Sequence, residues 1–152
     1  MIVKKIFFLI LVFSMSSCGY EPIFLKQNDL NKLIKNLELS GDKNINRKII
    51  SFLNLKENLE KQTGYSLKLN SNKILEIVSK EKTGNTSIYR TTINVNVSLD
   101  DEDGKPIKQK EFSSNFTYNN MKNKFDLSEY QKNIDVNLLN KITEEIFIFL
   151  NS

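Results

Sequence analysis

One stretch in the middle of the chain, residues 89–99, constrains the fold more than any other. Its alternate residues differ in character along the whole stretch. One set is mostly apolar and consists of Tyr89, Thr91, Ile93, Val95, Val97 and Leu99, while the residues between are Arg90, Thr92, Asn94, Asn96 and Ser98. Successive side chains of a strand point to opposite faces, so such a strand packs one face on a core and turns the other to water or to a polar partner. The stretch therefore predicts a half-buried strand in a sheet that is covered on one side only.

Two strands are predicted before this one. Leu33, Leu37 and Leu39 indicate a first strand that ends at 40–42, where Ser-Gly-Asp gives a turn and a helix start. Apolar residues at alternate positions from Tyr65 onward indicate a second strand over about 65–78, with a turn or bulge near Asn72.

A fourth strand is predicted over about 106–118, with Phe112, Phe116 and Tyr118 on one face. Tight turns at 83–86 and 100–104 join the last three strands, which are therefore expected to be antiparallel. The second turn is acidic, but it does not fit a calcium loop. If Gly104 took the sixth loop position, Leu99 and Lys110 would take the first and the twelfth, where oxygen ligands are required.

Two segments have helical periodicity. Residues 44–61 carry apolar side chains every three to four positions and are expected to end at Thr63-Gly64. Residues 128–150 form a second helix, in which Ser128 and Gln131 have the spacing of a capping box. Its apolar stripe consists of Ile134, Leu138, Ile142, Ile146 and Phe149. This stripe predicts core packing, and the alternative is a helix that lies at a membrane interface.

The predicted order is strand, helix, strand, strand, strand, helix. The first two strands flank a helix, so they are expected to be parallel. Both helices need an apolar surface, and one face of the sheet supplies it. The sequence therefore predicts an α+β fold, a two-layer sandwich in which two helices cover one face of a mixed four-stranded sheet.

The N-terminal segment has the pattern of a secretory leader. Lys4 and Lys5 precede an apolar run at 6–13 that is too short to span a bilayer, and small residues follow. Cys18, the only cysteine, comes directly after them, as in a bacterial lipobox, although Met15 stands where leucine is usual. We expect 1–17 to be a lipoprotein signal peptide, 18–30 a lipid anchor and tether, and 31–152 a single domain. The alternative is an ordinary signal peptide with a cysteine nearby by chance.

Composition excludes several function classes. The chain has no histidine, so Ser-His-Asp and Cys-His catalysis and histidine metal sites are impossible. Its net charge is +4 over the full chain and about +2 without the leader, which does not suggest nucleic-acid binding. We therefore expect no catalytic residues, no bound metal and no cofactor other than a covalent lipid, such as palmitate, at Cys18. A hydrolase that uses paired carboxylates stays a remote alternative.

Four stretches of the chain together are typical of one family. They are Cys18-Gly19-Tyr20-Glu21-Pro22-Ile23 at the anchor, Gly41-Asp42-Lys43 before the first helix, the long strand from Tyr89-Arg90, and Phe116-Thr117-Tyr118-Asn119-Asn120 before the last helix. In this order they resemble the LptE family of lipopolysaccharide-assembly lipoproteins. The resemblance implies a non-enzymatic lipoprotein of the cell outer membrane, anchored by lipid on the periplasmic side. It would plug the lumen of the large β-barrel that exports lipopolysaccharide, help that barrel to assemble, and contact lipopolysaccharide on its way out.

The resemblance also implies a basic contact to lipopolysaccharide at Lys82, with Lys80 and Arg90 close by on the same hairpin. A second basic contact in the last helix would fall near Val136, where this chain has no charge and where Lys132 or Lys141 could substitute. The alternative for Lys80 and Lys82 is a solvated strand end in a lysine-rich protein. The alternative function is a stand-alone periplasmic lipoprotein that carries lipid or acts as a protein chaperone, which would need an apolar cavity.

Overall fold

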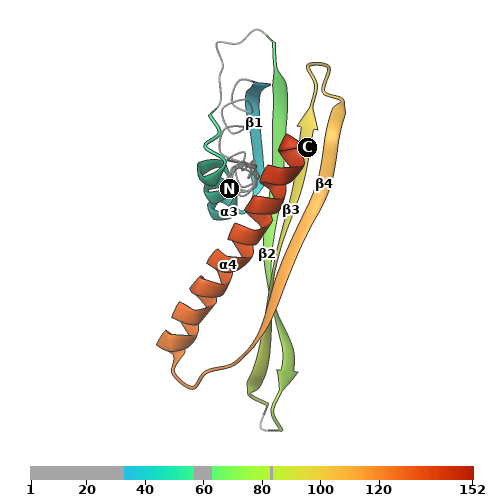
Figure 1. The fold of residues 1–152 in the computed structure, drawn as a ribbon. Coiled ribbons are helices and arrows are strands. Elements are labelled where there is room, and N and C mark those ends of the chain that lie inside the picture. Colours follow the sequence, from blue (N-terminus) through green and yellow to red (C-terminus); the bar gives the residue numbers. More distant parts are fainter. Residues whose placement is uncertain (1–32, 57–62, 83) are drawn as a thin grey trace, which may run out of the picture.

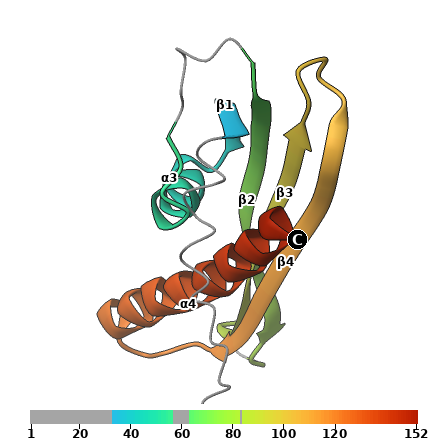
Figure 2. The same cartoon turned by 45° about the horizontal axis from the view of Figure 1, so that its top comes forward.

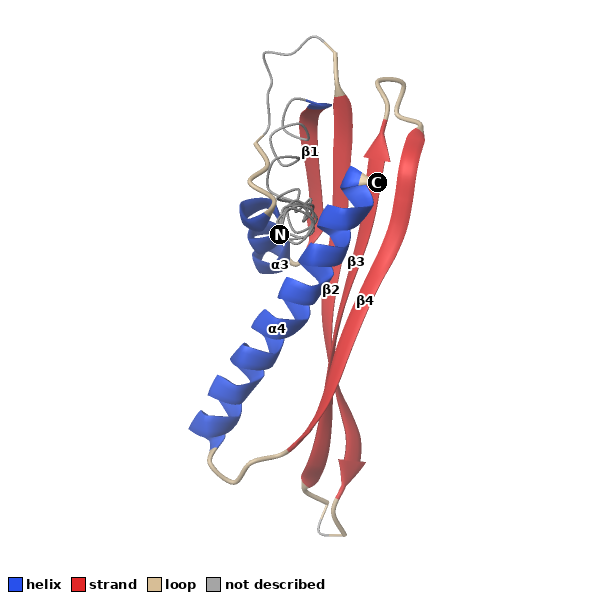
Figure 3. Cartoon of the chain, in the orientation of Figure 1, coloured by secondary structure: helices blue, strands red, loops and turns tan. Residues whose placement is uncertain are grey.

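The computed structural model describes residues 33–56, 63–82 and 84–152. Within them lie four strands and two helices: β1 (Ile34–Gly41), α3 (Lys43–Phe52), β2 (Tyr65–Lys80), β3 (Thr86–Asp100), β4 (Pro106–Asn119) and α4 (Lys124–Asn151). Both helices lie on the same side of the sheet (Figure 1 and Figure 3). The predicted α+β sandwich and its element order are confirmed. The expected signal peptide, Cys18 and the tether lie outside the described residues.

The strands form one sheet in the order β1-β2-β3-β4. β1 pairs with β2 in parallel, and the other two pairs are antiparallel, as predicted. The expected irregularity near Asn72 is wrong, because Asn72 pairs with Asn94 inside an unbroken register; the irregularity falls between Ile77 and Lys80 instead. A second irregularity between Ile34 and Asn36 turns Ile34 into the core and leaves Leu33 47% exposed, so Leu33 does not belong to the buried set.

The alternation predicted for β3 is confirmed. Thr91, Ile93, Val95, Val97 and Leu99 are buried, and Tyr89 packs against the core from a partly buried position. On β4, Phe112 and Tyr118 are buried as expected, but Phe116 is 45% exposed. The oblique path of α4 across the sheet explains this difference (Figure 2). From α4, Phe149 covers Phe112 and Tyr130 covers Tyr118, with ring centroids 5.6 and 5.8 Å apart, and Phe116 lies between these two contacts.

Helix α3 is shorter than the predicted 44–61. It ends at Phe52, and Asn54 has a positive φ of 49°, which stops helical propagation well before Thr63. Leu53 and Leu55 are buried beyond the helix end. Leu53 belonged to the apolar spacing behind the longer prediction, since a buried loop can carry the same residues as a helix stripe. Residues 57–62 of the predicted helix lie outside the described part of the chain.

Helix α4 begins four residues earlier than expected. Asn123 is its N-cap and accepts a hydrogen bond from the Phe125 N–H, so the capping box at Ser128 is wrong. Gln131 instead donates to the Tyr118 hydroxyl at 2.9 Å. The predicted stripe is confirmed as core, because Ile134, Leu138, Ile142 and Ile146 are buried and Phe149 packs against them. No helix among the described residues is both long enough and apolar enough to span a bilayer.

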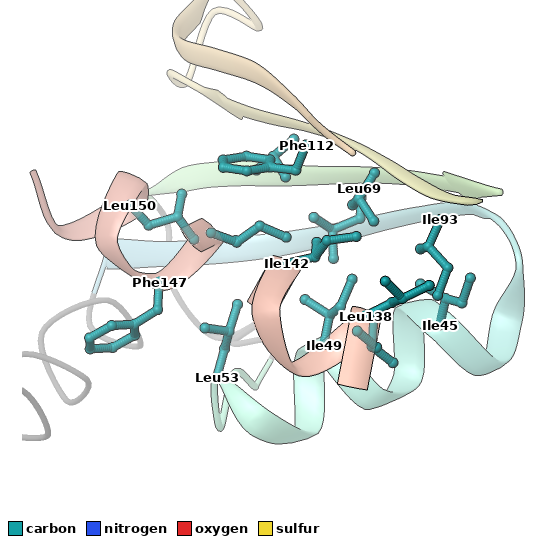
Figure 4. Packing of buried hydrophobic residues seen from close by; sticks show 14 of the residues in the cluster. Ile45, Ile49, Leu53, Leu69, Ile93, Phe112, Leu138, Ile142, Phe147 and Leu150 are labelled. Atoms are coloured by element: carbon teal, nitrogen blue, oxygen red, sulfur yellow. The ribbon is translucent and has the colours of Figure 1, made fainter. Parts of the chain in front are cut away.

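The core lies between the two helices and the sheet (Figure 4). Side chains from β2, β3, α3 and α4 interdigitate there, and the buried polar residues among them include Asn46, Ser71, Thr91 and Thr143. The members with at most 1% exposure include Ile49, Leu67, Leu69, Val95, Val97, Ile142 and Ile146. Burial of each such side chain contributes about 1.5–3 kcal/mol, so α4, with nine buried residues, is the main source of cohesion in this layer.

A tight junction connects β1 to α3. Gly41 has a φ of +82°, and the Asp42 N–H donates to the Ser71 carbonyl at 2.8 Å. The Asp42 carboxylate caps α3 by accepting from the Asn44 and Ile45 N–H groups at 2.8 and 3.1 Å. Asn46, 2% exposed, donates to the Ser40 carbonyl at 2.7 Å, and the Ser71 hydroxyl donates to its Oδ1 at 2.7 Å. These contacts fix where the strand ends and which way the helix leaves it.

Gly41→Ala is expected to destabilise the fold severely, by at least about 3 kcal/mol. A Cβ at this position would lie 1.9 Å from the Ser71 carbonyl oxygen, in addition to the cost of a positive φ. Gly84→Ala is the matched control, because Gly84 has a φ of +86° and a Cβ added there would have no neighbour within 4 Å, so only the backbone cost of roughly 1–2 kcal/mol applies. Urea unfolding of both variants measures the difference, and equal losses would contradict the steric role of Ser71.

Candidate functional site

The face of the sheet opposite the helices is polar. Its side chains come from the strand positions that alternate with the core residues. They include Glu38, Ser40, Lys68, Asn70, Asn72, Arg90, Thr92, Asn94, Asn96, Ser98, Gln109, Glu111, Ser113, Asn115 and Thr117. Neutral amides and hydroxyls predominate, so this face offers hydrogen bonds in both directions with little net charge. We call it the polar face.

A shallow hollow of about 500 Å³ lies on the polar face. Side chains of β1, β2, β3 and β4 line it, among them Glu38, Asn70, Asn96 and Gln109. The hollow follows from the twist of the sheet and from the small serine side chains beside these longer ones. Leu39, Leu69 and Val97 also line it, so it can receive a loop or side chain that has both polar and apolar groups.

An ion-pair network borders this hollow. Lys68 Nζ lies 2.9 Å from the Asp100 carboxylate and 3.7 Å from that of Glu38, and the Ser98 hydroxyl also donates to Asp100. Asp100 is 3% exposed, so its charge needs these partners. The hydrogen bond from Ser98, and then that from Lys68, holds the pKa of Asp100 below its ordinary value of 3.8. Correspondingly, the hydrogen bond to Asp100 raises the pKa of Lys68.

The three basic residues expected to contact lipopolysaccharide lie on one hairpin but do not form one cluster. Lys80 ends β2 and pairs with Thr86, and Lys82 lies in the turn that follows. Arg90 lies four residues beyond Thr86 on β3, which places it roughly 13 Å from Thr86 at the rise per residue of a strand. Its Nε donates to the Thr117 hydroxyl at 3.2 Å on the polar face. The hairpin therefore presents a basic tip and a separate arginine above it.

Two lysines that the sequence reasoning passed over lie beside this hairpin. Lys122 and Lys124, in the connection to α4 and its first turn, line a hollow of about 900 Å³ together with Asn85, Tyr89 and Asn120. The Asn120 side chain donates to the Thr86 carbonyl at 2.8 Å, which ties this connection to the base of the hairpin. The sequence contained a signal, since Lys122 and Lys124 come within four residues after Phe-Thr-Tyr-Asn-Asn, but lysine is so frequent in this chain that the pair did not stand out.

A tyrosine cluster supports the connection between β4 and α4. Tyr118 stacks on Tyr89 with ring centroids 5.8 Å apart and meets Tyr130 edge to face. Its hydroxyl lies 3.2 Å from the Thr91 hydroxyl and accepts from Gln131 at 2.9 Å. Both the ring and the hydroxyl of Tyr118 are thus satisfied, and this fixes the start of α4 relative to the hairpin.

The geometry of the described residues does not point to catalysis. Across 33–56, 63–82 and 84–152, no three acidic residues lie close enough together to hold a metal ion. The described hollows open at the surface and are lined by lysines, amides and hydroxyls, which bind and orient but do not form a nucleophile–base pair.

Comparison with known proteins identifies the family. The lipopolysaccharide-assembly family LptE matches residues 53–150, well over half of the chain. The chain belongs to the LptE family. Its membership associates it with the lipopolysaccharide transport machinery and thereby with the outer membrane. No curated protein sequence matches the chain significantly.

Solved structures of lipoproteins share the LptE-like fold. A minor lipoprotein from Acinetobacter baumannii has a TM-score of 0.59 at 11% identity, over 78% of this chain and 90% of its own. A lipoprotein from Caulobacter crescentus has a TM-score of 0.59 at 13% identity, over 82% and 91%. Rare lipoprotein B from Shewanella oneidensis has a TM-score of 0.52 at 16% identity, over 74% and 93%. At these identities the likeness supports the fold alone.

Asp100→Asn is expected to remove part of the acid sensitivity of this LptE-family domain. The folded-state pKa of Asp100 is depressed, so its charge stabilises the fold above its ordinary pKa near 3.8, and that contribution is lost as the pH falls through the lower folded-state value. Urea unfolding of wild type and variant between pH 7 and pH 2 checks this. Asp103→Asn, in the neighbouring exposed turn, is the control. Parallel stability curves for wild type and Asp100→Asn would contradict the assignment.

Proposed function

We propose that this LptE-family protein is a lipid-anchored plug of the outer-membrane β-barrel that exports lipopolysaccharide. In this role it occupies the barrel lumen, helps the barrel to assemble, and contacts lipopolysaccharide during its transfer to the outer leaflet. The observation that carries the proposal is the polar face. A folded domain exposes one side of its sheet mainly as amides, hydroxyls and charged groups, and the lumen of a large outer-membrane barrel is itself polar.

The filled core favours a plug over a carrier. The space between helices and sheet is occupied by side chains with almost no exposure, such as Leu67, Val97 and Ile146. A carrier of lipid needs an apolar cavity of several hundred Å³. The hollow on the polar face has that volume, but it opens at the surface, and Glu38, Lys68 and several amides and hydroxyls line it beside Leu39, Leu69 and Val97. Binding through surfaces, without catalysis, is the role that this arrangement supports.

Acylation of Cys18 would hold the domain at the periplasmic leaflet of the outer membrane. Two or more acyl chains make such anchoring stable, whereas a single chain binds reversibly. Gly19, which follows the cysteine, agrees with sorting to the outer membrane rather than retention at the inner one. The tether at 18–30 would then give the domain reach from the leaflet into the barrel.

The basic hairpin end is the surface proposed to contact lipopolysaccharide. Lys80, Lys82 and Arg90 belong to the hairpin, and Lys122 and Lys124 line the adjoining hollow. Phosphates and acidic sugars bind such groups through charge-assisted hydrogen bonds. Lysine supplies point charges rather than the bidentate fork of arginine, so this surface suits several anionic groups at variable spacing better than one fixed phosphate.

The full-length acylated protein is expected to co-purify with a large β-barrel after detergent extraction of outer membranes. Mass spectrometry identifies both the partner and the lipid on Cys18, and depletion of the protein is expected to reduce lipopolysaccharide at the cell surface. Recovery as a free monomer from membranes that contain the barrel would refute the plug role, and an unmodified thiol at Cys18 would refute the anchor.

Removal of the basic charge at the hairpin end is expected to weaken lipopolysaccharide binding. Lys80→Gln/Lys82→Gln and Lys122→Gln/Lys124→Gln should each lower the affinity roughly fivefold, about 1 kcal/mol, because each loses charge-assisted contacts. Lys43→Gln/Lys105→Gln removes the same charge far from this end and is the control. Binding of purified protein to lipopolysaccharide in detergent measures the effect. If all three pairs lose affinity equally, net charge rather than this surface is responsible.

A further inference from the structure

The lower half of β2 is an uncovered sheet edge among the described residues. β1 pairs with β2 only as far as Ser71, the partner of Gly41, and then turns into α3. β2 continues to Lys80, paired with β3 on its other side only. In Figure 1, β1 stops while β2 runs on to the hairpin tip. Residues 72–80 of β2 are called the open edge below.

The backbone of the open edge is oriented for pairing. The Ser71 carbonyl points to the β1 side, since it accepts from the Asp42 N–H. Strand residues alternate in direction, and the register with β3 is regular from Ser66 to Ile77. Lys73, Leu75 and Ile77 therefore present their N–H and C=O groups outward. Within the described part of the chain, no backbone hydrogen bond reaches these groups from that side.

The side chains of the open edge are unusually apolar for an exposed strand. Ile74, Leu75, Ile77 and Val78 are 40, 51, 52 and 45% exposed. Charge does not distinguish the two edges of the sheet, because the open edge carries Lys73, Glu76 and Lys80 and β4 carries three charged residues as well. The difference lies in the apolar side chains, since the open edge exposes four large ones within five residues, whereas β4 exposes Ile107 and Phe116 far apart along the strand.

We propose that the open edge is a strand-addition site, at which an extended segment of the partner barrel pairs with residues 72–77 of β2. The inference rests on the proposed function for the identity of the partner. Backbone hydrogen bonds from Lys73, Leu75 and Ile77 set the register, and the exposed apolar side chains bind alternate side chains of the incoming segment. Six residues give a contact of about 20 Å.

The charged residues at the two ends of the open edge indicate the chemistry of the incoming segment. At the upper end, Arg47, Lys48 and Lys73 outnumber Asp42 and Asp135 around one hollow. At the lower end, Lys80 and Lys82 outnumber Glu81. An apolar segment with an acidic residue at each end complements both.

The same charges disfavour a second copy of this chain as the occupant. In antiparallel self-pairing, the upper end of one copy would meet the lower end of the other, and both ends are basic. The register that matches Ile74 with Val78 also places Glu76 opposite Glu76. Like charges that face each other across strands are destabilising.

Leu75→Pro and Leu75→Thr separate strand addition from simple hydrophobic contact. Both remove the leucine side chain, but only proline removes the outward N–H, and proline is tolerated where an edge N–H faces solvent. In full-length acylated protein, Leu75→Pro should lower barrel recovery at least roughly tenfold and Leu75→Thr less than about threefold. Thermal unfolding checks that both variants are folded.

A second measurement tests the same contact without a proline substitution. Ile77 is replaced by photoreactive benzoylphenylalanine, and the adduct formed in cells is mapped by mass spectrometry. A barrel peptide with flanking acidic residues is the expected product.

Failure of this inference is distinguishable from failure of the proposed function. If wild type recovers no barrel, the proposed function fails. If wild type and Leu75→Pro recover it equally, or if the adduct joins Ile77 to a second copy of this chain or to no protein, strand addition is overturned while the plug role stands.

Discussion

The junction at Gly41 is the constraint on which the arrangement depends. Its positive φ and the absence of a side chain let Asp42 bond to the Ser71 carbonyl, so the parallel pairing of β1 and β2 ends there. The same turn lets the Asp42 carboxylate cap α3, while the buried Asn46 side chain holds the helix against both strands. One local geometry therefore places α3 over the sheet and leaves the rest of β2 paired with β3 alone among the described strands. Both consequences matter for binding. The placement of α3 completes the core, and the early end of β1 creates the open edge of β2.

The helix-facing side of the sheet serves stability, and the polar face is available for recognition. The helix-facing positions hold Leu67, Val95, Val97 and Phe112 in a dry core with α3 and α4. The opposite positions carry amides and hydroxyls that contribute little to stability and can be matched by another polar wall. Asp100 is the exception, since it is nearly buried, and its bonds to Lys68 and Ser98 make a small ordered patch in an otherwise adaptable surface. Such a division agrees with the plug role proposed above, in which the folded domain is enclosed by a partner.

The sequence predicted the features that follow from periodicity and missed those that follow from the path of α4. Alternation along β3 settled its buried face, and the order of elements settled the sandwich, because each helix had one surface available. Periodicity could not tell the buried loop at Leu53 and Leu55 from a helix. It could not foresee that α4 covers Phe112 and Tyr118 but passes by Phe116. Lys122 and Lys124 were missed for a related reason, since only the fold of the β4–α4 connection brings them beside the hairpin.

The lower half of the β2–β3 hairpin differs between its two strands. On β3, Thr91 and Ile93 are buried and belong to the core, whereas on β2 the large apolar side chains of residues 72–80, which extend past β1, are about half exposed. Stability of the domain alone does not require large apolar side chains at this edge, and an exposed apolar edge invites aggregation. Retention of such an edge next to a basic tip is consistent with a protein whose working state is a complex. In that state, the edge, the polar face and the hairpin end would meet three different parts of one enclosing partner and its anionic cargo.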